Sequence, residues 1–360
     1  MVDRKVFTLE ELPANRKTLN YKWVFVWKQE HGKITKAKAR IVAKGFMQKK
    51  EIDYNEVFAP TGTQDGLRLL FAMAAQRGYH MDSIDIKTAF LYGDLDEEIY
   101  LRQPEGYINE GKPGHVWRLR KAIYGLKQAG RVWYLKLKTV LCELGFISST
   151  CDPATFYRYE SDGYCSHLFV HVDDIIIAHT LQSVITEIKT EIKAHLEITD
   201  CGTLHSFLGL EILRGQDNSV FIHQATYIKT VISNHHVMHM HPKITPFPPG
   251  THLTSLTSGL NSDDPTHASN IPFDVEKYHS LVGSLAYASN QTRPDISHAV
   301  NTLSRYFRNP SLEHWNAAQH VLSYLSGTVN YGIHYLPGDR TLHSFSDADY
   351  ASDLETRRST

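Results

Sequence analysis

Hydrophobic residues follow two different periods along the chain, and together they predict a fold that mixes helices with strands. Apolar side chains at helical spacing indicate helices over residues 64–77, 126–144, 184–195 and 225–233. Short runs rich in β-branched and aromatic residues predict strands over residues 21–27, 36–43, 79–86, 154–160, 167–172 and 175–178.

The composition changes in the second half of the chain. Residues 242–272 contain six prolines among many Ser, Thr, Gly and Asn residues, which is typical of a linker or a long irregular connection. Three helical patterns follow over residues 275–290, 295–307 and 312–326, and then a strand pattern over 331–335. We therefore expect a folded part over residues 1–240, a linker over 241–272, a helical segment over 273–340 and a C-terminal piece over 341–360.

Charge is distributed unevenly, although the formal net charge is only −1. Between Lys22 and Lys50 there are nine basic residues and one acid, Glu30, a local net charge of +8. Such a cluster suits a polyanionic partner, because each neutralised phosphate releases a counterion. The alternative is a solvated surface hairpin with no partner. The strand patterns on either side of His31-Gly32 predict a β-hairpin in both cases.

Membrane and secreted proteins have features that this sequence does not show. No apolar run approaches the length of a membrane span, and the first ten residues have no apolar signal core. The four cysteines show no CxxC spacing, which is typical of reduced thiols. We therefore expect an intracellular protein of the cytoplasm or nucleus with no membrane partner.

An acidic pair, Asp173-Asp174, lies between two apolar runs that predict the strands of a hairpin. Adjacent carboxylates repel each other and lose hydration if they are buried, and a divalent cation would remove both penalties. The alternative is an Asp-Asp turn that is exposed to water. Asp85 ends another strand pattern and is a candidate third carboxylate, although it or Asp82 could simply cap a following helix.

Ordered blocks of sequence resemble the reverse transcriptase of Copia-type long-terminal-repeat retrotransposons. They are 22–25 and 38–46 (KWVF, KARIVAKGF), 85–91 (DIKTAFL), 103–107 (QPEGY), 124–129 (YGLKQA), 172–174 (VDD), 207–212 (FLGLEI), 281–287 (LVGSLAY) and 292–296 (TRPDI). Each block is a weak signal alone, but their ordered sum is specific. The resemblance runs from about Tyr21 to the C-terminus.

The resemblance implies an α+β right-hand polymerase fold. Fingers, palm and thumb would occupy residues 1–240, connection helices 273–340, and the start of a ribonuclease H-like domain 341–360. It implies Asp85, Asp173 and Asp174 as catalytic carboxylates, and two Mg²⁺ ions, replaceable by Mn²⁺, held at Asp85, Ile86, Asp173 and Asp174. Mg²⁺ prefers carboxylate oxygens and substrate phosphates, which is consistent with such a site.

The resemblance also implies binding residues for the incoming nucleotide and the primer. Arg40 would contact the triphosphate, because its guanidinium fork suits phosphate oxygens, and Lys38 is a weaker candidate. The backbone amides of Ile86 and Lys87 would meet the same triphosphate. Further positions are Tyr124 and Gly125 over the nucleotide and template, Leu208 and Gly209 at the primer end, and either Phe90 or Tyr92 under the sugar.

Departures from the family pattern leave activity open. His171 stands where Tyr or Phe is usual, two residues before the acidic pair, and Gly130 replaces a usual Pro. Asp347 resembles the first carboxylate of a ribonuclease H site, but the chain ends before the other carboxylates of such a site could appear, so we expect no ribonuclease H activity. A His-rich stretch over residues 235–241 is expected to be a solvated loop rather than a zinc site.

Two hypotheses of function remain. The first is an RNA-directed DNA polymerase that transfers nucleotides from dNTPs to a primer 3′-hydroxyl on an RNA or DNA template. The second is a decayed retrotransposon remnant that keeps the fold and nucleic-acid binding. In either case the chain resembles a piece of a longer Pol polyprotein, with self-association or other Pol segments as expected partners.

Overall fold

The central sheet has six antiparallel strands in the order β12-β5-β11-β10-β9-β8. The computed structural model describes residues 1–30, 33–161, 163–235, 241–248, 251, 253, 274–338, 341 and 343–346. The strand bounds are β5 His80–Ile86, β8 Ile147–Ser148, β9 Thr155–Tyr159, β10 Cys165–His171, β11 Asp174–His179 and β12 Ile198–Thr203. These bounds confirm the predicted strands of this region, except that β8 and β12 were not predicted.

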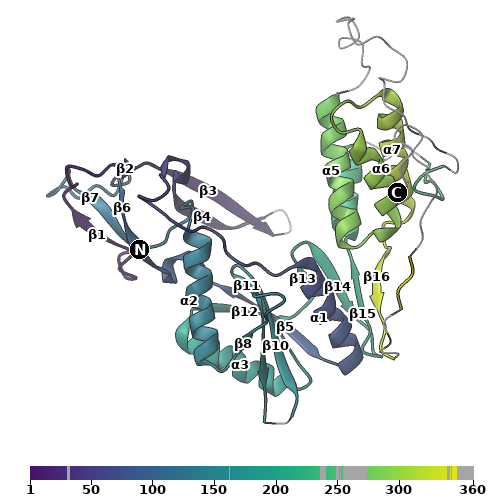
Figure 1. Cartoon of the computed structure of the whole chain (residues 1–360), viewed down its shortest axis with the longest axis horizontal. Coiled ribbons are helices and arrows are strands. Elements are labelled where there is room, and N and C mark those ends of the chain that lie inside the picture. The colour runs from purple at the N-terminus through teal and green to yellow at the C-terminus, as the bar shows by residue number, and fades with distance from the viewer. Residues whose placement is uncertain are drawn as a thin grey trace, which may run out of the picture. The chain divides into compact units, whose positions relative to one another are not determined.

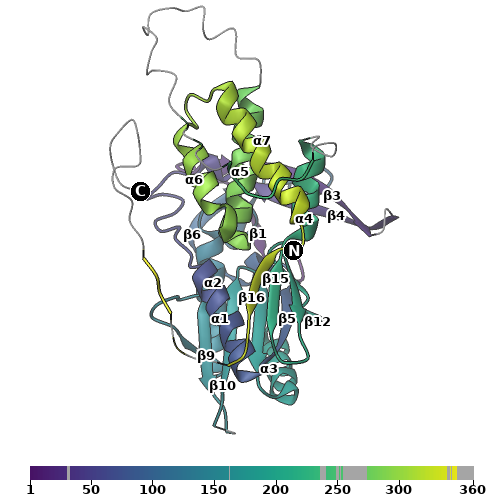
Figure 2. The ribbon, with the colours of Figure 1, turned by 90° about the vertical axis from the view of Figure 1, so that its right-hand side faces the viewer.

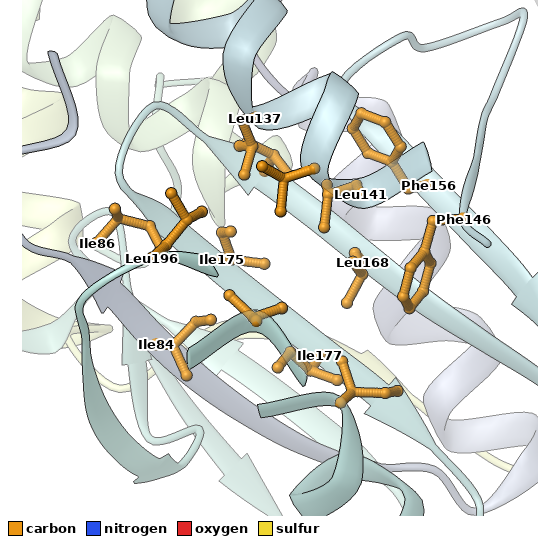
Figure 3. Packing of buried hydrophobic residues seen from close by; sticks show 14 of the residues in the cluster. Ile84, Ile86, Leu137, Leu141, Phe146, Phe156, Leu168, Ile175, Ile177 and Leu196 are labelled. Atoms are coloured by element: carbon orange, nitrogen blue, oxygen red, sulfur yellow. The ribbon is translucent and has the colours of Figure 1, made fainter. Parts of the chain in front are cut away.

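Alternation along the strands explains why helices cover one face of this sheet. One face of the sheet carries every second residue of each strand, for example Ile84 on β5, Leu168 on β10 and Ile175 on β11. There they pack against helices α2 (Ala129–Glu143) and α3 (Gln182–His195) (Figure 3). The two helices lie close to the predicted ranges, because their apolar stripes face this shared core.

The chain divides into two units. Unit 1 comprises Met1–Leu70 and Tyr79–Leu204, and unit 2 comprises Phe71–Gly78 and His205–Thr360. Helix α1 (Gln64–Arg77) contributes residues to both units. The predicted domain boundaries at 240 and 272 fall inside unit 2 and stay predictions.

Unit 1 also contains a smaller sheet and a long two-stranded ribbon (Figure 1). The sheet has the order β1-β7-β6-β2, with β1 Phe7–Glu10, β2 Thr18–Leu19, β6 Asp94–Leu101 and β7 Val116–Lys121. The ribbon pairs β3 (Tyr21–Glu30) with β4 (Lys33–Ala43), as the basic hairpin pattern predicted. Short 3-10 turns follow at η1 (Gly45–Met47) and η2 (Ala89–Tyr92).

Unit 2 combines a four-stranded sheet, β13-β14-β15-β16, with a helical bundle (Figure 2). Its strands are β13 Ser206–Phe207, β14 Leu210–Arg214, β15 Val220–His223 and β16 Gly332–Tyr335, and its helices are α4 Ala225–Asn234, α5 Val275–Gln291, α6 Ser297–Arg305 and α7 Leu312–Gly327. Tyr278, Leu285 and Leu322 are fully buried at the centre of the bundle. The helix predicted over 295–307 instead begins with a 3-10 turn, η5 (Pro294–Ile296), because Pro294 starts it.

Candidate active site

The acidic pair lies at a two-residue turn between β10 and β11. His171 and Asp174 are Cα partners, so Val172 and Asp173 form the turn. Val172 has a φ of 60°, a left-handed conformation that β-branched residues rarely adopt. Two hydrogen bonds hold it there: Trp133 Nε1 donates to Val172 O at 2.7 Å, and Ile86 N donates to Asp173 O at 2.8 Å. Strain of this kind clusters at functional sites.

Asp85 belongs to the same end of the sheet. It is the Cα partner of Asp174 across β5 and β11, so the pairing brings the three predicted carboxylates together. Asp82, the alternative candidate, lies on the opposite face. It is buried, and Lys189 Nζ of α3 donates to its carboxylate. The strand period of two therefore separates the roles of two aspartates that are only three residues apart.

Negative charge at this turn has little compensation from the protein. Burial raises the pKa of Asp173, and the charge of Asp85 raises it further, while His171 and Arg40 oppose this effect. Burial likewise raises the pKa of Asp174, followed by the charges of Asp173 and Asp85. Within the described part of the chain, no three acidic, His or Cys side chains already converge as a metal-binding set. The donor chemistry and the electrostatics suit cations, but these carboxylates alone do not complete a ligand shell.

A cavity of about 520 Å³ lies beside these carboxylates. Asp85 and Asp173 line it from the central sheet, and the basic residues of β4 line it from the ribbon. The cavity brings together most of the predicted nucleotide-binding residues: Lys38, Arg40, Ile86, Lys87 and Tyr124. A hollow with carboxylates on one side and cations on the other can accommodate a polyphosphate.

Tyr124 forms an aromatic wall of this cavity. The Arg40 guanidinium lies 5.4 Å from the centre of its ring, and the ring of Phe90 meets it edge-on at 4.8 Å. Burial raises the pKa of Tyr124, and the charge of Asp173 acts in the same direction. Of the two aromatic candidates that the sequence left open, Phe90 packs against this wall, whereas the Tyr92 ring packs against Trp133 and Arg4.

Gly125 does not line the cavity but fixes its wall. Its φ is +90°, and an added Cβ would lie 2.2 Å from Ala43 O. The preceding carbonyl, Tyr124 O, accepts a hydrogen bond from Ala43 N at 2.8 Å. Only glycine allows this close approach of the 124–125 backbone to β4.

The two backbone amides after Asp85 both have acceptors in the protein. Ile86 N donates to Asp173 O, and Lys87 N donates to Glu197 O at 2.9 Å. Their expected contact with a triphosphate stays a prediction. The side chain of Lys87 lies at the cavity and forms an ion pair with Glu197 at 3.0 Å.

Glu197 joins Lys87 to the N-terminal segment. Its second carboxylate oxygen pairs with Arg4 Nη2 at 2.7 Å, and the Arg4 guanidinium lies 4.5 Å from the ring centre of Tyr92. The hydrogen bond and charge of Lys87 hold the pKa of Glu197 below its ordinary value. Sequence reasoning missed Glu197 and Arg4, since no local pattern marks either residue.

The β3–β4 ribbon has two chemically different faces. Trp23, Phe25 and Trp27 alternate on β3 and share a face, and Phe25 and Trp27 are 70% and 63% exposed. Trp23 and Phe25 stack with ring centres 5.9 Å apart. Lys36, Lys38 and Arg40 belong to the opposite face and line the cavity. An element that carries both exposed aromatic rings and basic residues is typical of single-stranded nucleic-acid surfaces.

The two predicted primer-end residues are not among those that line this cavity. Leu208 and Gly209 belong to unit 2 and form the turn between β13 and β14. Asp347 and residues 236–240 of the His-rich stretch lie outside the described residues. His171 Nδ1 is buried with no hydrogen-bond partner among the described residues.

The sequence matches the family model "Reverse transcriptase (RNA-dependent DNA polymerase)" over residues 4–249, more than half of the chain. Similar proteins include the Retrovirus-related Pol polyproteins from transposon TNT 1-94 of Nicotiana tabacum and from transposon RE2 of Arabidopsis thaliana. Each is 35% identical, over 98% and 97% of this chain but only 26% and 23% of the relative. A putative transposon Ty5-1 protein of Saccharomyces cerevisiae is 32% identical over 75% of this chain and 84% of its own length.

This chain therefore spans about a quarter of the two plant polyproteins that it matches. No described helix is long and apolar enough to cross a membrane. The resemblance that the ordered motifs predicted is confirmed: the chain belongs to the reverse transcriptase family, in the form carried by Copia-type retrotransposon Pol polyproteins.

Proposed function

We propose that this chain is an RNA-directed DNA polymerase that extends a primer 3′-hydroxyl with deoxynucleotides on an RNA or DNA template. One observation carries the proposal. The pairing of β5 with β11, and of β11 with β10, brings Asp85 together with Asp173 and Asp174 beside a cavity that is lined by cationic residues. Family membership alone supports the class of enzyme but not the activity of this segment.

The cationic side of the cavity is suited to the triphosphate of a dNTP. Arg40 offers a planar fork of donors, and its contact with the Tyr124 ring fixes the direction in which that fork points. Lys38 and Lys87 add ammonium groups along the same cavity. These three cations would bind and orient the substrate while the aspartates lie at its reacting end.

Two Mg²⁺ ions are part of this proposal, held by Asp85, Asp173 and Asp174 with Ile86 nearby. The raised pKa values of Asp173 and Asp174 support it, because burial first and the neighbouring carboxylates second disfavour the ionised forms, and bound cations would offset both penalties. An incomplete protein ligand set is consistent with Mg²⁺, which keeps several waters and takes substrate phosphates as ligands. When bound, such ions supply charge stabilisation at the attacking and leaving oxygens of an in-line displacement.

Primer extension tests the proposal. The purified chain is incubated with oligo(dT)-primed poly(rA), dTTP and Mg²⁺ or Mn²⁺, alongside Asp173→Asn. We expect extension by the wild type and its loss in the variant, with primer–template binding retained by both. If wild type and variant are equally inactive yet bind the substrate, the chain is a decayed remnant. In that case His171→Tyr, which restores the usual family residue, shows whether position 171 caused the decay.

A further inference from the structure

The predicted primer-end residues form a tight turn with an unusual backbone. Phe207 and Leu210 are Cα partners, so Leu208 and Gly209 are the two central residues of the β13–β14 hairpin. Their φ angles are 49° and 81°, as a type I′ turn requires. Glycine adopts this conformation freely, but leucine does so only under strain. The turn therefore depends on contacts from outside the hairpin to keep its shape.

Tyr287 of helix α5 supplies such a contact. Its hydroxyl donates to Leu208 O at 3.0 Å. A Cβ added at Gly209 would lie 3.1 Å from the same hydroxyl oxygen, so the turn packs closely against it. One side chain thus bonds to the first central residue of the turn and leaves little room for a side chain at the second.

Tyr227 of α4 holds the Tyr287 ring in place. The two rings meet nearly edge-on, with centres 4.9 Å apart. The Tyr227 hydroxyl donates at 3.2 Å to the carbonyl oxygen of Ser284, which lies on α5 three residues before Tyr287. Tyr227 and Tyr287 therefore make the same kind of hydrogen bond, from a hydroxyl to a carbonyl, but only Tyr287 reaches the turn.

Several bonds join the helices of unit 2 to the strands that carry the turn. Thr292, just after α5, donates to Gln224 Oε1 at 3.0 Å in a fully buried contact. Glu211 of β14 accepts from Thr226 N of α4 at 2.8 Å. Strand β16, which follows the bundle, pairs with β15 through Ile333 and Ile222 (Figure 2). The hairpin and the bundle are thus joined at several points within unit 2.

We infer that Tyr287 is a positioning residue for the primer end. Tyr287 lies beyond residue 249, where the match to the reverse transcriptase family model ends. This inference rests on the proposed function, which assigns Leu208 and Gly209 to the primer. The hydroxyl acts through the turn and touches no reacting atom.

The test compares Tyr287→Phe with Tyr227→Phe as a matched control. Each variant removes one hydroxyl-to-carbonyl bond and keeps its aromatic ring. A primer with 2-aminopurine at its 3′ end reports the position of the primer terminus by fluorescence. We expect Tyr287→Phe to change this signal and to lower the extension rate about two- to tenfold, the worth of one neutral hydrogen bond. The KM for dNTP should stay unchanged and the two variants should have similar Tm values, because each loses one hydrogen bond. Tyr227→Phe should match wild type in the fluorescence and extension assays.

Gly209→Ala provides a second perturbation of the same turn, through its Cβ and its positive φ. Its effect on the terminus should not add to that of Tyr287→Phe in the double variant, because both act on one turn. Wild-type behaviour of Tyr287→Phe in fluorescence and extension would overturn the inference. A wild-type chain that binds the probe but does not extend it would sink the proposed function alone, since the fluorescence comparison needs no catalysis.

Discussion

Lys189 lies beneath the strand that carries Asp85, and its replacement by Met gives a sharp test of how the site is supported. Lys189 Nζ of α3 donates to Asp82 on β5 and to Asp200 Oδ1 on β12 at 2.6 Å. The side chains of Lys189 and Asp82 are only 10% and 5% exposed. Lys189→Met removes the ammonium and keeps most of the apolar stem, so Asp82 loses its buried counter-charge.

The cost follows from burial and from the partners that remain. Removing one member of a buried ion pair costs about 3–5 kcal/mol. Two features reduce this value: Asp200 is 54% exposed and can be hydrated, and Gln182 Nε2 still donates to Asp82 at 2.9 Å. We therefore expect a loss of about 2–4 kcal/mol in the free energy of unfolding at pH 7.

The sign of the pH dependence can also be derived. Burial alone lowers the pKa of Lys189, but hydrogen bonds to Asp200 and Asp82 outweigh it and raise the pKa above 10.5. The stabilisation is therefore fully present below pH 10.5 and is lost as the pH rises through the higher folded-state pKa. The difference between wild type and Lys189→Met should accordingly shrink at strongly alkaline pH.

Urea unfolding followed by circular dichroism and tryptophan fluorescence measures the effect. The double variant Lys189→Met/Asp82→Leu is the control, since an apolar pair of similar volume often replaces a buried ion pair without loss. We expect it to recover most of the lost stability. Two results would refute the reasoning: a single variant whose free energy of unfolding falls by less than about 1 kcal/mol, or a double variant that is less stable than the single one.

Three further predictions concern the turn and the ribbon. Asp174→Asn should raise the Tm at pH 8 without Mg²⁺, because burial raises the pKa of the native carboxyl and its ionised form therefore lowers stability. The gain in Tm should shrink toward pH 4, and equal Tm values of wild type and variant at pH 8 would contradict the prediction. Trp133→Phe removes the donor to Val172 O and should lower the free energy of unfolding in urea by about 1–3 kcal/mol. An unchanged free energy of unfolding would show that this hydrogen bond does not support the turn. Phe25→Ala and Trp27→Ala should each weaken binding of a template with a single-stranded overhang by about 1–3 kcal/mol, measured by fluorescence anisotropy. Binding of a blunt duplex should stay the same, and equal losses of affinity for both substrates would exclude stacking on the unpaired bases.

Local patterns were enough to predict the elements that build the site. The apolar runs on either side of Asp173-Asp174 form β10 and β11 as expected, because a buried strand has a strong and short-range signature. The basic pattern around residue 31 likewise forms the β3–β4 ribbon. The period of two also explains why Asp82 and Asp85 face opposite sides of the sheet, although only the family resemblance singled out Asp85.

Long-range contacts could not be predicted in the same way. Glu197 pairs with Lys87 and Arg4, which are 110 and 193 positions away in the sequence. The support of the Leu208 turn by Tyr287 spans 79 positions. The amides of Ile86 and Lys87 donate to Asp173 O and Glu197 O, which a motif alone does not reveal. Such contacts depend on tertiary packing, which local propensity does not encode.

The central claim is that Asp85, and not its neighbour Asp82, acts in nucleotidyl transfer. Single-nucleotide incorporation under single-turnover conditions tests it directly, with Asp85→Asn and Asp82→Asn compared at saturating dTTP and Mg²⁺. We predict that Asp85→Asn slows incorporation by more than about a hundredfold, since even residues that only orient metal ligands are worth 10–100-fold. Folded Asp82→Asn should stay within about threefold of wild type, because its side chain contacts Lys189 and Gln182 rather than the cavity. Equal losses in the two variants, or a fully active Asp85→Asn, would contradict the account.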